Sequence, residues 1–450
     1  MKMTNRFLII AVAAVALSSC ATFKGKKKTP VLGQRIAILA GENDVLADKT
    51  IAGVEVLVPP AVTNDNWAQP GGNSAKSIGN MTLGANLSRA WSVTIDGGSN
   101  RQRLGAAPVV ADGRLYAIDV DAEVHAFSAT NGGSVWTTNI ATLDKKSRSA
   151  RFGGGVSFED GKVFATDGLG DVVALDAATG KVIWRAKPGA PLRGSPTVAN
   201  GEVYILSQDN QLYALSQADG SVQWTQSGSI ETQGVFGVAA PAVSQGTVVA
   251  GFSSGELNAY RYENGRTLWQ DALSRSTIST SVSSLADIDA DPVIDRGIVF
   301  AVGQGGRMVA LEIVSGQRLW EQNFAGISTP WVAGEWVFMV TDDARLVCLA
   351  RATGKVRWIS QLRRYKSEKV KKDGTVKDSK KANPVTWYGP VLAGNRLVLT
   401  NSQGQIASAS VDTGKVTSVI DAKAPFTLPP IVANSTLYVL DQKGRVTAYK

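Results

Sequence analysis

The octapeptide AATGKVIW, residues 177–184, returns almost unchanged as RATGKVRW at residues 351–358. Each copy ends a segment of fixed length. In five segments the same interval separates a proline from a tryptophan: Pro108 to Trp136, Pro196 to Trp224, Pro241 to Trp269, Pro292 to Trp320 and Pro330 to Trp358. A constant spacing over so many copies indicates an internal structural repeat.

Two more segments keep this interval with one landmark changed. It separates Val156 from Trp184 and Pro390 from Ser418, so the last of these seven segments has lost its tryptophan. A further segment begins at Pro430 and stops at Lys450, before its final part. A glycine precedes each of the seven end points at a constant distance: Gly132, Gly180, Gly220, Gly265, Gly316, Gly354 and Gly414.

A small residue occupies one constant position in every segment, counted from its start. These residues are Ala126, Ala174, Ala214, Ala259, Ala310, Cys348, Ser408 and Ala448. We expect them where neighbouring sheets approach too closely for a larger side chain. Cys348 is therefore interpreted as a buried spacer and not as a nucleophile. The single histidine, His125, is interpreted as an ordinary strand residue.

Each segment has the pattern of four strands. Residues 195–226 provide an example, because SPTVAN, GEVYILSQ, QLYALSQ and SVQWTQ alternate in polarity and are separated by turn residues. Repeats of this length with four strands are typical of propeller blades. The stretch LSRAWSVTI around Trp91 is a strand of the kind that the last segment lacks. We therefore predict an all-β, eight-bladed β-propeller whose N-terminal strand completes the last blade and leaves no exposed edge there.

The N-terminus predicts export and a lipid anchor. Lys2 and Arg6 precede an apolar run at residues 7–17, which is too short to span a membrane and suits a signal peptide. Leu17-Ser18-Ser19-Cys20 resembles a bacterial lipobox, although an ordinary signal peptide is the alternative. We expect a signal peptide at 1–19, acyl chains including palmitate on Cys20, a tether at 20–62 and the propeller at 63–450. Several chains on one residue anchor firmly where one chain does not.

The net charge of +9 does not indicate nucleic-acid binding. Nine basic and three acidic residues lie in the stretch 362–381, and lysines gather in the tether, so the predicted propeller itself carries no excess of positive charge. A lysine-rich insertion of this kind is most often a solvated loop. Contact with anionic lipid headgroups is a second possibility.

The ATGKxxW pattern resembles the repeat of pyrroloquinoline-quinone propellers, which include the quinoprotein alcohol dehydrogenases. That resemblance implies adjacent cysteines over a quinone, with a Ca²⁺ site and a catalytic Asp. Here the two cysteines are Cys20 and Cys348, far apart in the chain. The acidic stretch DIDADP at 287–292 begins like an EF-hand loop, but Pro292 replaces its glycine and Ile298 its last ligand. We predict no enzyme, catalytic residue, cofactor or metal site, with a quinoprotein-like oxidoreductase or cofactor-binding protein as the alternative.

Over about residues 20–450 the chain resembles the BamB family of lipoproteins. The resemblance rests on the lipobox, the repeats, NWAQPGGN at 66–73 and STSVSSLADIDADPVIDRGIVF at 279–300. It implies a non-enzymatic scaffold of the outer-membrane β-barrel assembly (BAM) complex. Such a scaffold lies on the periplasmic side of the outer membrane and binds the POTRA domains of BamA. Whether unfolded outer-membrane proteins also bind is left open.

The same resemblance implies two contact loops on one face of the ring. One is acidic, and Asp287 and Asp289 match it. The other is a leucine-and-arginine loop before a blade's first strand, whose counterpart is IETQGVFGVAAP at 230–241. That segment contains no arginine and places Gln233, Val235 and Phe236 at the contact positions. The alternatives are packing of Phe236 beneath the loop and turn capping by the Asp pair. As rim residues, Asp287 and Asp289 are expected to tolerate lysine with little loss of thermal stability.

Overall fold

The structure is a computed structural model that describes residues 45–99, 102–142, 154–229, 239–273, 287–367 and 383–450. All described residues belong to one compact unit, Val45–Lys450. Cys20, Gln233, Val235, Phe236 and most of the basic insertion therefore lie outside the described residues. Within the described ranges, no helix is long and apolar enough to cross a membrane.

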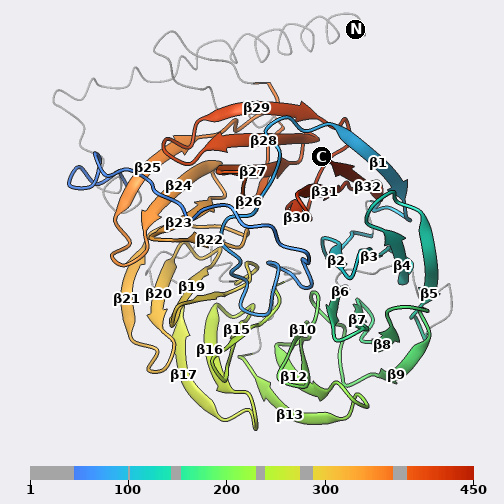
Figure 1. The fold of residues 1–450 in the computed structure, drawn as a ribbon. Coiled ribbons are helices and arrows are strands. Elements are labelled where there is room, and N and C mark those ends of the chain that lie inside the picture. The colour runs from blue at the N-terminus through green and yellow to red at the C-terminus, as the bar shows by residue number, and fades with distance from the viewer. Residues whose placement is uncertain (1–44, 100–101, 143–153, 230–238, 274–286, 368–382) are drawn as a thin grey trace, which may run out of the picture. The chain divides into compact units, whose positions relative to one another are not determined.

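The strands form eight antiparallel sheets of four strands each, arranged as blades around a central axis (Figure 1). This confirms the predicted eight-bladed β-propeller. Blades 1 to 4 contain β2 (Val109–Ala111), β3 (Arg114–Ile118), β4 (Glu123–Ser128) and β5 (Ser134–Asn139); β6 (Gly154–Glu159), β7 (Lys162–Asp167), β8 (Val172–Asp176) and β9 (Val182–Ala186); β10 (Thr197–Ala199), β11 (Glu202–Leu206), β12 (Gln211–Ser216) and β13 (Val222–Ser227); and β14 (Ala242–Ser244), β15 (Thr247–Gly251), β16 (Glu256–Arg261) and β17 (Thr267–Ala272).

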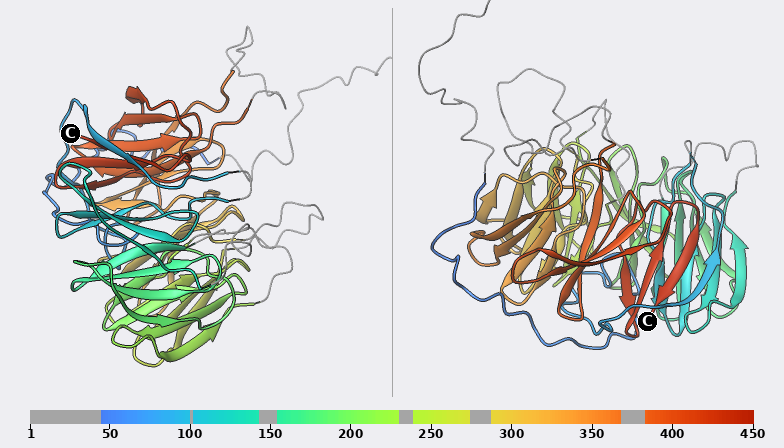
Figure 2. Two further views of the ribbon diagram at one scale, coloured as in Figure 1. Left: turned by 90° about the vertical axis from the view of Figure 1, so that its right-hand side faces the viewer. Right: turned by 90° about the horizontal axis from the view of Figure 1, so that it is seen from above.

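The other four blades follow the same order from the inner to the outer strand. They contain β18 (Val293–Asp295), β19 (Ile298–Val302), β20 (Met308–Glu312) and β21 (Arg318–Gln322); β22 (Trp331–Ala333), β23 (Trp336–Val340), β24 (Arg345–Ala350) and β25 (Val356–Gln361); β26 (Trp387–Ala393), β27 (Arg396–Asn401), β28 (Gln405–Ser410) and β29 (Val416–Asp421); and β30 (Ile431–Ala433), β31 (Thr436–Leu440) and β32 (Arg445–Tyr449), with β1 (Arg89–Thr94) outermost. Figure 2 shows the blades from the side.

Burial within a blade follows the position of the strand. In blade 3 the second strand, β11, is almost wholly buried, whereas the outer strand β13 buries only Trp224 among its six residues. The inner strands are apolar because neighbouring blades cover both faces. In an outer strand such as β13 most residues are exposed, because only the tryptophan side chain reaches the joint between blades.

The two ends of the propeller pair in blade 8, as predicted. β1 lies antiparallel to β32, with Trp91 opposite Ala448. Beyond the strands, the Ser88 amide donates to the Lys450 carbonyl oxygen at 2.7 Å, and the Lys450 amide donates back to the Ser88 carbonyl oxygen at 2.9 Å. The last blade therefore has its fourth strand, and the ring is closed by backbone hydrogen bonds.

Each repeat tryptophan connects its blade to the next one. The indole Nε1 donates to a backbone carbonyl oxygen near the turn between the third and fourth strands of the following blade. The seven bonds are Trp91 to Ala129 (3.2 Å), Trp136 to Ala177 (3.0 Å), Trp184 to Gln217 (2.9 Å), Trp224 to Tyr262 (2.8 Å), Trp269 to Ile313 (2.7 Å), Trp320 to Arg351 (2.8 Å) and Trp358 to Val411 (2.9 Å). A buried indole needs such a partner.

The repeat glycine lies beneath this indole. All seven have positive φ, and Gly220 has φ +75°. A Cβ added to Gly220 would lie 2.5 Å from Cε3 of Trp184. Glycine is therefore required twice, by the left-handed turn and by the aromatic ring. Together these contacts explain why tryptophan and glycine recur at a fixed distance.

The seventh segment has no tryptophan because the eighth blade has no turn to receive one. Ser418 stands in the outer strand of blade 7 and is exposed. In blade 8 the chain ends after β32, and β1 arrives from elsewhere in the sequence. Without a turn glycine in that blade, an indole at position 418 would have no matching surface.

The small residues face the tryptophans. The register places Ala214 opposite Trp224 and Cys348 opposite Trp358, and the other blades repeat this pairing up to Ser408 opposite Ser418. Opposite residues project to the same face of a sheet, so a small side chain leaves room for the indole. This constraint lies within one sheet, in addition to the close approach of neighbouring sheets that we expected. Cys348 is fully buried, which confirms its interpretation as a spacer.

Gly220→Ala and Gly201→Ala provide a matched test of the joint in blade 3. Both glycines have positive φ, but a Cβ at Gly201 meets no atom within 4 Å. We expect Gly220→Ala to lower the free energy of unfolding by about 1–3 kcal/mol more than Gly201→Ala does, because only the new Cβ at position 220 collides with Trp184. Urea unfolding followed by tryptophan fluorescence measures the difference. Equal losses in the two variants would contradict the indole–glycine joint.

Candidate functional site at the centre of the ring

Residues 64–82, which we call the lead-in segment, run along the inner strands of all eight blades in order. In Figure 1 this is the blue chain at the centre of the ring. It bonds to one residue or more of every blade: Asn64 to Asn434 (2.8 Å), Trp67 to Val110 (2.7 Å), Ala68 to Phe158 (2.7 Å), Gln69 to Val198 (2.9 Å), Ser74 to Val243 (2.8 Å), Ala75 to Ile294 (2.9 Å), Gly79 to Trp331 (2.9 Å), Met81 to Leu392 (3.3 Å) and Thr82 to Ser435 (2.8 Å). The circuit begins and ends at blade 8.

The lead-in segment satisfies backbone groups that the blades leave unpaired. Every inner strand is the edge of its sheet, and its outward-facing amides and carbonyls need partners. The Gln69 side chain both accepts from the Val198 amide at 2.9 Å and donates to the Val198 carbonyl at 2.8 Å. The Gln69 side chain thus makes the two backbone hydrogen bonds that a neighbouring strand would make.

The chain before the lead-in segment is also held by the ring. The Asp48 amide donates to the Val356 carbonyl oxygen at 2.8 Å, and Arg357 Nε donates to the Val54 carbonyl oxygen at 2.5 Å. Val56 is buried. Residues 48–54, within the segment expected to be a tether, thus lie along the outer strand of blade 6.

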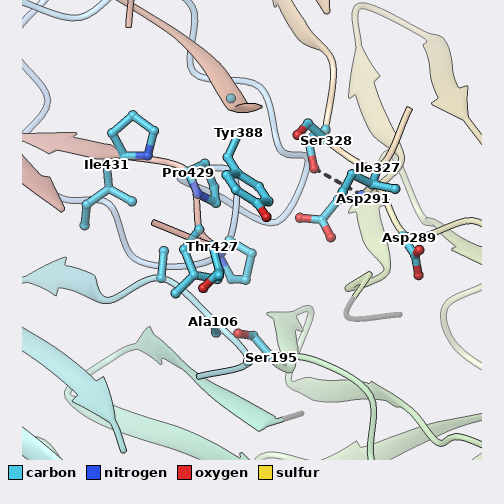
Figure 3. A pocket seen from close by; sticks show the side chains of 18 of the residues that line it. Ala106, Ser195, Asp289, Asp291, Ile327, Ser328, Tyr388, Thr427, Pro429 and Ile431 are labelled. Carbon is cyan, nitrogen blue, oxygen red and sulfur yellow. Dashed lines mark hydrogen bonds between the residues drawn. The ribbon is translucent and has the colours of Figure 1, made fainter. Parts of the chain in front are cut away.

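A cavity of about 540 Å³ lies above the lead-in segment (Figure 3). Its floor includes Trp67 and Trp331, whose rings stack with centroids 5.9 Å apart. Its walls come mainly from the loops that enter the inner strands, among them residues 193–195, 289–291, 327–329 and 427–431. The described residues therefore place one sizeable cavity at the axis of the propeller.

The structure corrects the expectation that Asp287 is an exposed rim residue. Its carboxylate is 1% exposed and lies 2.7 Å from Nη2 of Arg193, which is 2% exposed. Asp289 lies 3.5 Å from the same Nη2, and its side chain is 9% exposed. The guanidinium reaches these carboxylates from the loop before blade 3, whereas both Asp residues precede blade 5. Asp287 is therefore a buried part of the ring, whereas Asp289 is of intermediate burial and lines the central cavity.

Burial and crowding shift the pKa values of the acids here. Burial and the nearby Asp287 carboxylate raise the pKa of Asp289 to about 7, and Arg193 opposes both effects. Gln304 Nε2 donates a hydrogen bond to Asp289 Oδ2. Burial also raises the pKa of Asp291, opposed by Lys76 and by the Ala240 amide, which donates to Oδ1 at 2.7 Å.

Lys76 belongs to the lead-in segment and is buried. Its Nζ donates to Oγ1 of Thr197 at 3.0 Å. Burial lowers the pKa of Lys76 to about 8, and the charge of Asp291 opposes that shift. Two basic side chains from distant segments thus lie near the aspartates of one loop. Arg193 contacts Asp287 and Asp289, and Lys76 lies close enough to Asp291 for their charges to interact.

Arg193 and Lys76 were not among the site residues expected from the sequence. Leu192 and Arg193 lie in the loop before the inner strand of blade 3, so this loop fits the description of a leucine-and-arginine loop. It lies one blade earlier than the segment 230–241, which was expected to be that loop. Leu192 is fully buried, however, and Arg193 nearly so. Lys76 follows NWAQPGGN closely, but nothing in the sequence indicates that its side chain is buried.

His125 is a strand residue with a local structural contact, as predicted. Its Nε2 lies 2.8 Å from Oδ2 of Asp119, whose Oδ1 accepts from the amides of Asp121 and Glu123. The same turn capping recurs without histidine at Asn401 and Asp441. The acidic group of Asp119, Glu123 and His125 is therefore explained by the turn that it stabilises.

The fold and the cavity together define an eight-bladed propeller of the quinoprotein type. The family model described as "Outer membrane protein assembly factor BamB" matches residues 120–360, more than half of the chain. The chain therefore belongs to this family, which confirms the resemblance seen in the sequence.

Proteins of the same name are similar to this chain. The protein from Escherichia coli is 28% identical over 399 residues, which cover 79% of this chain and 87% of that one. The protein from Vibrio cholerae is 34% identical over 252 residues, covering 56% and 64%. For the one from Yersinia pestis, with 27% identity over 256 residues, the coverages are 56% and 60%.

Solved structures show the same fold. The crystal structure of BamB from Moraxella catarrhalis has a TM-score of 0.68 at 18% identity and covers 81% of this chain and 100% of that one. A quinohemoprotein alcohol dehydrogenase from Comamonas testosteroni has a TM-score of 0.66 at 15% identity, with coverages of 89% and 83%. At these identities the likeness concerns the fold alone.

The cavity does not fit the cofactor of the quinoprotein dehydrogenases. Pyrroloquinoline quinone carries several carboxylates, which would lie against Asp289 and Asp291. Cys348, the cysteine among the described residues, is buried in blade 6 and does not line the cavity, so it supplies no adjacent cysteine pair there. Burial also raises the pKa of its thiol. The carboxylates of this cavity favour a different kind of occupant.

Asp287→Ala tests the buried ion pair. Removing this carboxylate leaves Arg193 buried without its nearer partner, and such a loss costs about 3–5 kcal/mol. We expect a clear loss of the free energy of unfolding in urea, and little change for Glu55→Ala, an exposed control. The double variant Arg193→Ala/Asp287→Ala should lose less than the sum of the single changes. Thermal stability near that of the unchanged protein in Asp287→Ala would contradict the pair and restore the rim expectation.

Asp289→Asn tests the raised pKa of Asp289. Because the folded pKa lies above the unfolded one, the ionised carboxylate weakens the folded state, and stability falls as the pH rises from about 4 through 7. The asparagine variant lacks this dependence, so relative to the unchanged protein it should gain about 1 kcal/mol or more between pH 5 and pH 8. Urea unfolding at the two pH values measures this. A stability difference that does not vary with pH would contradict the shift.

Proposed function

We propose that this protein is a non-enzymatic scaffold lipoprotein of the BAM complex, which helps to assemble and insert β-barrel proteins into the outer membrane. The observation that carries the proposal is the match of residues 120–360 to the family of outer membrane protein assembly factors. The alignment with the Escherichia coli relative, which spans most of both chains, agrees with it. In this role the ring is a rigid body that presents loops to other subunits.

The proposed location is the periplasmic side of the outer membrane, with lipid on Cys20. The lipobox at 17–20 and the preceding apolar run support this location. The bonds of Asp48 and Val54 to blade 6 provide a fixed point where the chain that follows the anchor joins the ring. A lipid on Cys20 would then restrain the ring through this blade.

The proposed partner is a POTRA domain of BamA, bound at the ring face that carries the loop of Asp289. The segment with Gln233, Val235 and Phe236 is proposed as the second contact. Its C-terminal end supports this placement, because the Ala240 amide bonds to Asp291, two residues from Asp289. Asp287, being buried, would act by holding Arg193 and so fixing the loop. A charge such as that of Asp289, at the edge of such a contact, would contribute orientation and specificity more than affinity.

Whether unfolded outer-membrane proteins also bind this protein directly is left open by the proposal. The quinoprotein alternative has support from the fold alone, since a dehydrogenase shares the propeller. The charges of the cavity oppose a carboxylate-bearing quinone. The scaffold function therefore has the stronger support.

Affinity purification tests the proposed function. The full chain, with Cys20 intact and a tag after Lys450, is purified from detergent-solubilised envelopes of its own host. We expect a POTRA-bearing outer-membrane protein to co-purify in comparable amount. Val235→Ser/Phe236→Ser should reduce its recovery at least tenfold, with the thermal midpoint and the amount of tagged protein unchanged. Val182→Ser/Ile183→Ser, which changes exposed apolar residues on the outer strand of blade 2, is the matched control. Recovery of the tagged protein alone would overturn the scaffold proposal.

A further inference from the structure

Among the described residues, acidic groups outnumber basic groups around the central cavity. Asp289 and Asp291 line it, and the electrostatic influence of Asp287 and Asp342 on Asp289 places two more carboxylates nearby. The basic groups are Arg193 and Arg103, which line the cavity, and Lys76, which acts on Asp291 from the lead-in segment. Arg103 is exposed, whereas the carboxylates lie deeper. Once these carboxylates are ionised, an anion in the cavity would meet more negative than positive charge.

One oxygen of the Asp291 carboxylate accepts no hydrogen bond from the described residues. Its Oδ1 accepts from the Ala240 amide at 2.7 Å, and none of the described residues donates a hydrogen bond to Oδ2. Figure 3 shows the carboxylate directed into the cavity, on the side of Tyr388. A carboxylate that is oriented by one oxygen and open at the other is arranged to accept from a donor that enters the cavity.

A second polar group in the wall also lacks a partner. Ser195 is 4% exposed and lines the cavity, and its Oγ has no hydrogen-bond partner among the described residues. Buried hydroxyl groups are rarely left in this state unless water or a ligand completes them. This hydroxyl belongs to the loop before blade 3 and is directed toward Ala106 and Gly155, so it is a polar group of the wall that is separate from the acidic loop.

The opposite wall is apolar. Pro429 and Ile431 face Asp291 across the cavity in Figure 3, and Leu428 and Pro390 also line it. Trp67 and Trp331 form the floor. Carboxylates on one side and apolar and aromatic surface on the other suit a molecule with a charged end and an apolar body. Aromatic rings also attract cations.

We infer that the central cavity binds an organic cation, with its ammonium group at Asp291 and its apolar body against Leu428, Pro429 and Trp331. The volume of about 540 Å³ lies within the range of about 300–1,000 Å³ that is usual for small-molecule sites. An alkylammonium group has two sources, a free amine and a lysine side chain of a bound protein segment, and the chemistry of recognition is the same for both. The site is independent of the proposed role in the BAM complex.

The binding test uses n-hexylammonium chloride on the purified full-length protein, with n-hexanol and sodium hexanoate at equal ionic strength as neutral and anionic matches. Isothermal titration calorimetry or ligand-observed NMR measures the dissociation constants. We expect hexylammonium to bind at least tenfold more tightly than either match. Equal binding of hexanol or hexanoate, or no binding of the amine, would overturn the inference.

Two variants locate the site by independent properties. Asp291→Asn keeps an acceptor for the Ala240 amide and removes the charge, and it should weaken hexylammonium at least tenfold, whereas Glu55→Gln should not change it. Thr427→Trp fills the half-buried apolar side without changing charge and should also abolish binding. If Asp291→Asn fails to fold, Thr427→Trp still decides the question. Unchanged affinity in a folded variant of either kind would contradict the assignment.

The pH dependence of binding tests the role of the carboxylates, and a peptide distinguishes the two sources of the alkylammonium group. Hexylammonium stays charged near neutral pH, while Asp289 and Asp291 have raised pKa values, so its affinity should increase from pH 6 to pH 8. Tyr388, whose pKa is also raised by burial, stays neutral over this range. Acetyl-Leu-Lys-Leu-amide is then compared with its acetyl-lysine form. Tighter binding of the lysine peptide than of hexylammonium assigns the site to a protein segment, and the reverse assigns it to a free amine; loss of discrimination by charge contradicts both.

Discussion

The contact on which the rest of this structure depends is an indole ring that lies on the turn glycine of the next blade. A single four-stranded sheet cannot bury its own faces, and it becomes stable only when its neighbours cover it. The tryptophan supplies apolar area and a hydrogen bond, and the glycine makes the approach possible. The spacing of the two residues in the sequence follows from this contact. Where the eighth blade lacks the turn, the seventh blade lacks the tryptophan.

The second constraint is the lead-in segment, which contacts the blades at the central axis of the ring and not at the joints between blades. It pairs with all eight inner strands in order and provides the floor of the cavity. Its Lys76 adds a positive charge beside Asp291, while Arg193 holds Asp287 and Asp289. The ring thus has a polar, well-bonded centre in which each of these charged groups comes from a different part of the chain than its partner. Such an arrangement fixes the loops around the axis, which is what a scaffold for other proteins needs.

The repeat itself was predictable from the sequence, because the residues that make the joints recur at constant spacing. The closure by β1 and β32 was predictable for the same reason, since one segment lacked a strand and LSRAWSVTI supplied it. The burial of Asp287 was not predictable, because Arg193 stands 94 residues earlier and two blades away. Nor was the course of the lead-in segment, whose bonds use a different residue at every blade and therefore leave no periodic pattern. Gln233, Val235, Phe236 and Cys20 lie outside the described residues and stay predictions.

The structure indicates that the whole ring is a single cooperative unit closed by the pairing of its two ends. Native-state hydrogen exchange in low concentrations of urea tests it most directly, by comparing amides of β1 with amides of β11 and β12 in blade 3. If the claim is correct, the Trp91 and Val93 amides, which face β32, exchange with the same free energy and the same urea dependence as those of blade 3. Exchange of β1 at a much lower free energy, without urea dependence, would show that the end strand opens locally and that the ring does not depend on its closure.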